Sequence, residues 1–384
     1  MAESDLGILG GGQLARMLLA AATAFGLDVT IMEPAPDSPA GRLTRHEIVG
    51  AWDDEAALHH LAGCTTTITL ENEFVPARSL CLLEQCGCTV VPSSSALAIV
   101  QDKLRQKEQL AAAGLPVPPF RPVTDAADVL ACARELGWPL LLKRRRNGYD
   151  GYGNRTLHGP DDVAPAVAAL QGPVDRLAEE RALMVEGYVG FARELAVMVA
   201  RGRDGQIRLY PVVQTVQRNH ICHQVYAPAA IARDVAEQAA VIARAAVEAL
   251  GLHGVAGVEL FLAADGAITI NELAPRVHNS GHYTIEACVT SQFENAVRAA
   301  LGLPLGDTTL VAPAAAMVNL LGARGAPARP AGLAAALAVP GAHVHLYGKR
   351  HSRPGRKMGH VTALGATLDE AAAIARSAAA RITI

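Results

Sequence analysis

The chain contains 384 residues, enough for two or three domains with separate hydrophobic cores. Its 51% hydrophobic and 18% charged residues exclude an intrinsically disordered protein, and its net charge of −3 argues against a general nucleic-acid-binding protein. The sequence lacks an apolar run of about 18 residues and starts with the acidic segment Met1–Asp5, so we expect a cytoplasmic protein without membrane span or signal peptide.

Residues 5–100 alternate short apolar runs with helical stretches, a pattern that predicts an α/β unit with a parallel sheet. The expected strands are Leu6–Leu9, Val29–Met32, Thr65–Leu70 and Val90–Val91, and the expected helices are Gln13–Phe25 and Gln101–Ala113. The proline-rich stretch Pro116–Pro119 ends the second helix and indicates a domain boundary.

A second unit is expected from residue 126 onward. It begins with a helix over Ala126–Leu136 and ends with a helix over Asp234–Leu250. The strands expected between them are Leu140–Lys143, Leu183–Val189, Glu194–Ala200 and Arg208–Val213. Residues 315–384 have the pattern of a small α/β unit.

A glycine-rich turn, Gly10–Ala15, lies where the first strand meets the first helix. It fits the pattern G-x-G-x-x-G/A, and Glu33 stands where a dinucleotide fold places its ribose-binding acid. Glycines let the backbone approach an anion at a helix N-terminus, but they also serve tight strand–helix packing. An NAD-dependent oxidoreductase is the alternative that this turn suggests, although it leaves the later motifs unexplained.

A basic, glycine-punctuated segment follows the strand that ends at Lys143. The segment Lys143–Asn154 suits a mobile lid over nucleotide phosphates. A solvated basic hairpin is the alternative.

A predicted hairpin brings two carboxylates together. If Asp265–Gly266 is a two-residue loop, Ala264 pairs with Ala267, and by the same register Glu259 lies opposite Glu272. Two opposed carboxylates repel unless a proton or a cation lies between them. Such hard oxygen ligands suit magnesium bound together with substrate phosphates.

The segment Asn271–His282 follows this hairpin directly. His278 and His282 have the spacing of zinc ligands on a helix, but Asn279–Gly281 between them favours a loop or a helix start. We therefore expect these histidines to form hydrogen bonds with substrate or backbone.

Further charged residues suggest binding of a phosphate and an amine. The segment Lys349–His360 contains five cations and two glycines, which favours a phosphate site over a nonspecific anion patch. Glu71 and Glu73 follow an expected strand, where they could meet an amine or simply solvent.

Taken together, these segments resemble the ATP-grasp superfamily and, within it, the family of 5-(carboxyamino)imidazole ribonucleotide synthetases. The resemblance rests on Gly10–Met17, Thr69–Pro76, Lys143–Gly153, Glu259, Asn271–His282 and Arg353–His360. It implies an α/β chain with a Rossmann-like parallel-sheet domain (1–100), an α+β ATP-grasp domain (101–312) with a small lid subdomain (about 120–190), and a small C-terminal α/β domain (313–384).

The resemblance also implies an activity, cofactors and partners. Such enzymes use ATP and magnesium to join bicarbonate to the amine of 5-aminoimidazole ribonucleotide through carboxyphosphate. The implied partners are this ribonucleotide, ATP, bicarbonate and a second copy of the chain, and neither nucleic acid nor a membrane is implied.

Roles of individual residues follow from the same resemblance. Magnesium contacts are implied for Glu259 and Glu272, and catalytic roles for Lys143 and for Arg276, which would steady bicarbonate or the transferring phosphoryl group. ATP contacts are implied for Lys103, Lys143, Gly148, Tyr149, Asp150, Gly151, Tyr152, Gly153, Asn154, Glu186, Gly187, Tyr188, Val189, Glu194, Gln217, Asn271 and Glu272. Ribonucleotide contacts are implied for Gly12, Gln13, Leu14, Glu73, Tyr152, Arg155, His278, Asn279, Lys349, Arg353 and Arg356.

The chain departs from the family pattern after Val213. The family pattern there is Glu-Asn-x-His, but this sequence has Gln214, Thr215 and Gln217 at the three specified positions. Glutamine exchanges hydrogen bonds but carries no charge. Two alternatives stay open: a nucleotide-binding regulatory homologue, and another ATP-grasp ligase such as a formate-using glycinamide ribonucleotide transformylase or a biotin carboxylase. Because the metal and lid motifs are intact, we expect an active enzyme.

Overall fold

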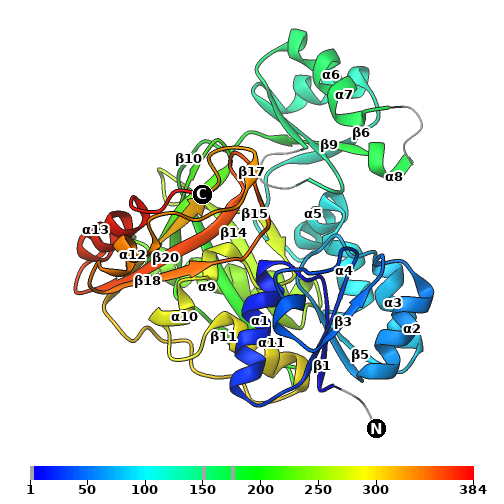
Figure 1. Ribbon diagram of the computed structural model, residues 1–384. Helices are drawn as coiled ribbons and strands as arrows, with labels where there is room; N and C mark the ends of the chain where they lie inside the picture. The colour runs from blue at the N-terminus through cyan, green and yellow to red at the C-terminus, as the bar shows by residue number, and fades with distance from the viewer. Residues whose placement is uncertain (1–3, 149–152, 174–177) are drawn as a thin grey trace.

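The N-terminal part of the protein is a parallel sheet between helices (Figure 1). The computed structural model describes residues 4–148, 153–173 and 178–384. The strand order is β3 (His46–Val49), β2 (Val29–Glu33), β1 (Leu6–Leu9), β4 (Thr67–Leu70) and β5 (Thr89–Val91). The connections contain α1 (Gln13–Ala24), η1 (Gly41–Leu43), α2 (Glu55–Cys64), α3 (Ala77–Gln85) and α4 (Ser94–Val100). The predicted parallel α/β unit is confirmed, and its fully buried β1 is typical of a sheet that helices cover on both faces.

A small antiparallel sheet with its own core projects from the rest of the molecule (Figure 1). Its strand order is β6 (Phe120–Val123), β9 (Leu183–Gly187), β7 (Leu140–Arg144) and β8 (Asn154–Leu157). Its helices are α6 (Ala126–Leu136), η2 (Pro160–Asp162), α7 (Val163–Gln171) and α8 (Ala178–Arg181). Helix α5 (Lys103–Ala112) leads into this unit from the N-terminal part.

The largest sheet combines strands from the middle and the end of the chain. Its order is β15 (Ile268–Ala274), β14 (Gly254–Ala263), β10 (Phe191–Arg201), β12 (Val213–Arg218), β13 (Ile221–Ala227), β16 (Ala314–Leu321), β20 (Lys357–Gly365) and β18 (Ala342–Leu346), with β11 (Ile207–Leu209) added on β10. Because β13 pairs with β16, the C-terminal strands β16, β20 and β18 continue this sheet.

Helices cover the large sheet and connect its strands. They are α9 (Arg233–Ala249), η3 (Asn279–Gly281), α10 (Thr284–Ala287), α11 (Gln292–Leu301), α12 (Leu333–Leu337) and α13 (Leu368–Ala379). A separate short pair joins β17 (Ala326–Pro327) to β19 (His351–Ser352). Within the ranges that the structure describes, no helix is both long enough and apolar enough to cross a bilayer.

The single strand predicted over Arg208–Val213 is wrong. The structure has β11 and β12 there, separated by residues 210–212. Pro211 lies in this gap and cannot donate a backbone hydrogen bond to a neighbouring strand. The buried side chain of Tyr210 fills the core at the break, and its backbone N–H donates to the carbonyl of Met198 at 2.9 Å.

The predicted turn of the carboxylate hairpin is also wrong. Ala264 does not pair with Ala267, because the backbone N–H of Ala263 donates to the carbonyl of Ala267 at 2.9 Å. The loop therefore has three residues, 264–266, and Gly266 takes the positive φ of 90° that such a loop requires. The strands beyond the loop are shifted by one residue from the predicted register.

Candidate active site

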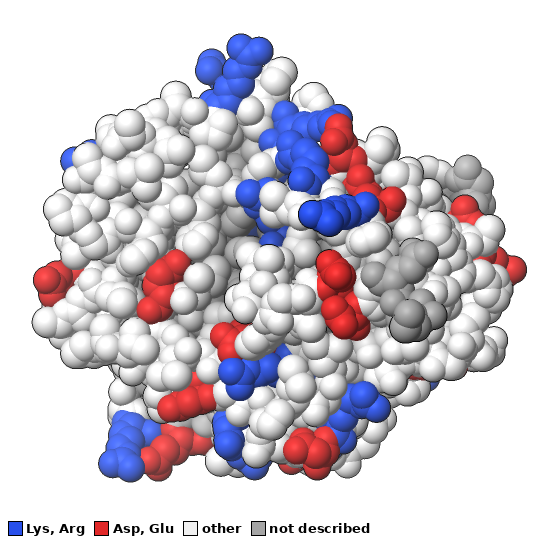
Figure 2. Space-filling view, turned by 60° about the horizontal axis from the view of Figure 1, so that its bottom comes forward, with Lys and Arg blue, Asp and Glu red and all other residues white. Residues whose placement is uncertain are grey.

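The candidate site is a cavity of about 900 Å³ where the three sheets meet. Gln13 reaches it from the N-terminal part, Lys143 from the small sheet, Glu259 from the large sheet and Arg356 from the turn before β20. Figure 2 shows Lys and Arg side chains gathered beside a hollow in one face of the molecule. A chain with net charge −3 thus concentrates positive charge locally.

Glu259 on β14 and Glu272 on β15 lie directly opposite each other, as predicted. The shifted register pairs Leu260 with Ile270, and a bulge then leaves Asn271 without a partner residue on β14. The extra residue in the loop and the extra residue in the bulge compensate for each other. The carboxylate pair is therefore correct although its predicted turn is not.

The two carboxylates have unequal proton affinities. Burial would raise the pKa of Glu272, but the ammonium of Lys103, in contact with it, and that of Lys143 together outweigh burial and lower that pKa. Burial raises the pKa of Glu259, and the negative charges of Glu272 and Glu194 add to the effect. Glu259 is therefore the carboxylate of the pair that binds a proton more readily, while the Lys103 ammonium favours the charged form of Glu272.

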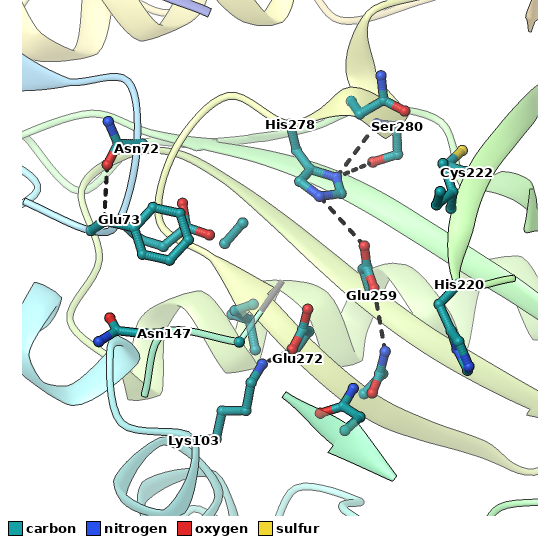
Figure 3. Close-up of a pocket in the computed structure, with 18 of the residues that line it drawn as sticks. Asn72, Glu73, Lys103, Asn147, His220, Cys222, Glu259, Glu272, His278 and Ser280 are labelled. Carbon is teal, nitrogen blue, oxygen red and sulfur yellow. Dashed lines mark hydrogen bonds and ion pairs between the residues drawn. The ribbon is translucent and has the colours of Figure 1, made fainter. Parts of the chain in front are cut away.

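The donor groups at this hairpin fit magnesium. Glu259 and Glu272 face the cavity together (Figure 3), and Asn271 Nδ2 lies 3.3 Å from Glu259 Oε2, so two carboxylates and an amide line one wall. Among the described residues, no cluster of three or more His, Cys, Asp or Glu side chains could hold a metal ion. A magnesium ion here would therefore need oxygen ligands from elsewhere, such as phosphates.

Behind this wall, one buried carboxylate contacts two lysines. Lys143 Nζ donates to Glu186 Oε2 at 2.8 Å, and Lys107 Nζ lies 3.6 Å from Glu186 Oε1. Burial would raise the pKa of Glu186, but the two ammonium groups outweigh it and hold that pKa below its usual range. Lys107 is absent from the predicted site, although its spacing of four residues from Lys103 places both on one face of α5.

The glycine-rich turn is stabilised by a protein carboxylate. Buried Glu71 accepts hydrogen bonds from the backbone N–H groups of Gly12, Leu14 and Ala15 at 2.9–3.1 Å. These are the groups that would otherwise bind a phosphate at the N-terminus of α1. The predicted anion site at this helix end is therefore already occupied by Glu71.

Glu33 does not have the role of a ribose-binding acid. Its Oε2 accepts from the backbone N–H of Gly11 at 2.7 Å, so both acids near the turn serve the turn itself. This arrangement removes the basis of the NAD-dependent alternative. Within the turn, Gln13 and Leu14 line the cavity, whereas Gly12 does not.

An ion pair joins the N-terminal part to the segment after β15. Arg276 binds Glu73 through both Nε and Nη2, with Nη2 at 2.9 Å from Oε1. Burial would raise the pKa of Glu73, but Arg276 outweighs it and lowers that pKa. The fork of the guanidinium matches the two carboxylate oxygens, which fixes both side chains at the cavity.

The two histidines of the H-N-S-G-H segment form hydrogen bonds. His278 caps η3, with Nδ1 at 2.9 Å from Ser280 Oγ and Nε2 at 3.4 Å from Glu259 Oε1 (Figure 3). Burial, reinforced by Arg276, lowers the pKa of His278 to about 3, so its ring is neutral. His282 is 1% exposed, and its Nδ1 lies 3.1 Å from Gln292 Nε2.

The C-terminal strands hold the other side of the cavity. Asn319 on β16 exchanges two hydrogen bonds with Asn279, at 2.7 and 2.9 Å, and so fixes an amide at the cavity wall. Lys349 Nζ donates to the carbonyl of Lys357 at 2.7 Å, and Arg356 Nη1 donates to that of His351 at 2.8 Å. These contacts order the basic segment along the cavity.

Most of the predicted site residues meet in this one cavity. Residues 149–152 lie outside the described residues, and the described ones that do not line the cavity are Gly12, Gly153, Arg155, Glu186 and Gly187. The exposed Arg155 instead lines a separate surface pocket beside Asp161 and Asp162. The sequence analysis did not predict the stacked rings of Phe191 and Phe261, whose centroids lie 4.5 Å apart at the cavity. Each strand contributes a single phenylalanine, so no regular spacing in the sequence indicates that the two rings meet.

Three family profiles match successive parts of the chain. The ribonucleotide synthetase preATP-grasp domain matches residues 3–101, and the ATP-grasp domain matches residues 108–293. The phosphoribosylaminoimidazole carboxylase C-terminal domain matches residues 315–374.

Curated relatives and solved structures agree with these profiles. The N5-carboxyaminoimidazole ribonucleotide synthase of Synechococcus elongatus is 44% identical over 93% of this chain and 88% of its own length. The chloroplastic phosphoribosylaminoimidazole carboxylase of Vigna aconitifolia is 40% identical over 95% of this chain, which spans only 65% of that longer protein. The crystal structure of the Aspergillus clavatus synthase with ADP and 5-aminoimidazole ribonucleotide superposes with a TM-score of 0.88, at 35% identity and 99% coverage of both chains. The chain therefore belongs to the N5-carboxyaminoimidazole ribonucleotide synthase family of the ATP-grasp superfamily.

Proposed function

We propose that this protein uses ATP and bicarbonate to carboxylate the exocyclic amine of 5-aminoimidazole ribonucleotide, a step of purine biosynthesis. The observation that carries the proposal is one cavity with a carboxylate pair and two lysines on one wall and a basic segment on another. The first wall suits magnesium and nucleotide phosphates, and the second suits the phosphate of a ribonucleotide. The names of the relatives and the ligands of the Aspergillus structure support this assignment.

The reaction needs bicarbonate in an activated form, because hydroxide is a poor leaving group. Transfer of the γ-phosphoryl group from ATP to a bicarbonate oxygen gives carboxyphosphate and ADP. The amine nitrogen then attacks the carboxyl carbon, phosphate leaves with one bicarbonate oxygen, and the amine loses a proton. The protein contributes positioning, charge neutralisation and exclusion of water from the intermediate.

The nucleotide side of the site is proposed at β14, β15 and the small sheet. Lys103 and Lys143 line the cavity and would bind phosphate oxygens, and Glu259 and Glu272, with Asn271 beside them, would hold magnesium. The magnesium ion would neutralise charge on the transferring phosphoryl group. The base and ribose would contact Tyr188, Val189, Glu194, Gln217 and the stacked pair of Phe191 and Phe261.

The ribonucleotide side is proposed between Gln13 and the C-terminal basic segment. Lys349, Arg353 and Arg356 offer cations to a phosphate, and His278 and Asn279 offer fixed polar groups to the base or ribose. Glu73 holds the guanidinium of Arg276 at the cavity, where it would steady bicarbonate. The homodimer, the cytoplasmic location and the domain boundaries given above (1–100, 101–312 and 313–384) stay predictions.

An isotope experiment tests this proposal. With ¹⁸O-labelled bicarbonate, ATP, magnesium and the ribonucleotide, one labelled oxygen should appear in each inorganic phosphate released. Omission of the ribonucleotide should abolish the fast phase of that release. Inorganic phosphate free of label during rapid turnover would refute transfer of the phosphoryl group to bicarbonate.

A further inference from the structure

Three buried charges lie side by side at the junction of the small sheet and the large sheet. Lys107, Lys143 and Glu186 are 2%, 3% and 2% exposed. Lys143 Nζ donates to Glu186 Oε2 at 2.8 Å, and Lys107 Nζ forms an ion pair with Glu186 Oε1 at 3.6 Å. Lys143 lines the cavity, whereas Lys107 and Glu186 lie behind it. Lys107 thus has no route to a ligand, yet it is a buried cation beside the proposed nucleotide site.

The net charge of Lys107, Lys143 and Glu186 together indicates a role for Lys107. A buried Lys143 with Glu186 alone would form a neutral pair, and its ammonium would have little attraction left for a phosphate. The second ammonium shares the carboxylate, so the triad carries one net positive charge. Because Lys143 is its only member at the cavity wall, that charge is presented to the cavity there.

Lys107 also connects the triad to the carboxylate hairpin. Its Nζ donates to the carbonyl of Ile270 at 3.0 Å, and Ile270 directly precedes the bulged Asn271 on β15. Glu186 lies on β9 of the small sheet. The Lys107 ammonium therefore connects two strands. It contacts β9 through Glu186, which binds Lys143, and it contacts β15, which carries Glu272.

We propose that Lys107 is a positioning residue that shares Glu186 with Lys143 and thereby keeps the Lys143 ammonium available to a nucleotide phosphate. This inference rests on the proposed ATP-dependent function. It assigns Glu186 a carboxylate role in addition to any backbone contact with the base. It also distinguishes Lys107 from Lys103, which contacts Glu272 and lines the cavity itself.

The test is calorimetric binding of ADP with magnesium to the full chain and to charge variants. Lys107→Met should weaken binding by about tenfold or more, because Glu186 then neutralises Lys143. Lys107→Arg should retain more affinity than Lys107→Met. The decisive variant combines Lys107→Met with Glu186→Gln, since removal of both charges again leaves Lys143 with a net positive charge. That double variant should bind ADP within about threefold of wild type.

The outcomes separate a charge role from a merely structural one. If Lys107 served only packing, the second substitution would leave binding as weak as in Lys107→Met or weaken it further, and either result overturns the proposal. Wild-type affinity in Lys107→Met also overturns it. If circular dichroism shows that Lys107→Met does not fold, the double variant and Lys107→Arg decide by the same criteria. Failure of the wild-type protein to bind ADP would instead count against the proposed function.

Discussion

At the level of single residues, the cavity keeps its carboxylates in different states through their neighbours. Lys103 contacts Glu272 and lowers its pKa, while burial and the charge of Glu272 raise the pKa of Glu259. A metal ion that binds both carboxylates would compete with the Lys103 ammonium for Glu272 and with the raised proton affinity of Glu259. Such a site binds a cation strongly only when further negative ligands, such as phosphates, arrive with it.

Glu272→Gln should reduce turnover by two or more orders of magnitude and leave the fold intact, because an amide replaces a charged magnesium ligand. The measurement compares kcat for ADP release between this variant and the wild-type protein at ordinary magnesium, and circular dichroism checks that the variant folds. Glu237→Gln is a matched control, since Glu237 pairs with Arg233 on an exposed face of α9. Wild-type turnover in Glu272→Gln would contradict the metal assignment.

Arg356→Ala should raise the KM for the ribonucleotide by roughly tenfold or more and affect the KM for ATP much less, because it removes a cation from the proposed phosphate site. Initial rates with each substrate varied in turn give both constants. Arg329→Ala, an exposed arginine of the same C-terminal region, serves as the control. An unchanged ribonucleotide KM would show that the basic segment binds something else.

Substitutions of Gln217 test whether the departure from the family pattern after Val213 affects ATP binding. Gln217 lines the cavity on β12, at the position where the resemblance implies a histidine in the family pattern and an ATP contact. Gln217→Ala should raise the KM for ATP about fivefold, the value of one neutral hydrogen bond, and leave the ribonucleotide KM unchanged. Gln217→His should retain affinity for ATP. If Gln217→Ala binds ATP like wild type, the residue has no part in the nucleotide site.

At the level of elements, most of the strands and helices that the sequence analysis named are present near their predicted ranges, whereas elements such as β3, β13, α2 and α3 were not predicted. Helix α6 begins and ends where its apolar spacing predicts, at Ala126 and Leu136. The break at Pro211 and the three-residue loop at Gly266 depend on backbone hydrogen bonds that residue types alone do not specify. The contact between Glu71 and the glycine-rich turn spans more than 50 residues of sequence, so no local pattern could reveal it.

Two buried histidines, where the segment after η3 meets β20, should stay unprotonated in the folded protein. His282 and His360 are buried with ring centroids 5.1 Å apart, and His360 Nδ1 lies 2.9 Å from Tyr347 Oη. Burial lowers the pKa of both histidines well below the usual value. Their ring signals in NMR spectra should therefore stay constant between about pH 8 and 5.5.

The same two histidines should make the folded state less stable in acid. Below the unfolded pKa of about 6.5, the unfolded chain binds protons that the folded chain does not. Each residue then favours unfolding by up to about 1.4 kcal/mol per pH unit as the pH falls. The control is the urea-unfolded protein, whose histidine signals should titrate near that pH. Titration of His282 or His360 near pH 6.5 in the folded protein would contradict their burial as neutral rings.

At the level of the whole molecule, the cavity exists only because three sheets meet. The ion pair of Arg276 with Glu73 ties the N-terminal part to the large sheet, and the paired amides of Asn279 and Asn319 tie in the C-terminal strands. The motif residues could be predicted from the sequence because they cluster in short segments. Lys107 could not, because its role depends on Glu186, which lies 79 positions away in the chain and reaches it only in the folded state.

The measurement that tests the central claim most directly is ADP release by the purified protein with magnesium, ATP and bicarbonate, with and without 5-aminoimidazole ribonucleotide. The proposed carboxylation predicts strong stimulation by the ribonucleotide and loss of that stimulation in Glu272→Gln. ADP release at the same rate with and without the ribonucleotide, or no ADP under either condition, would contradict it.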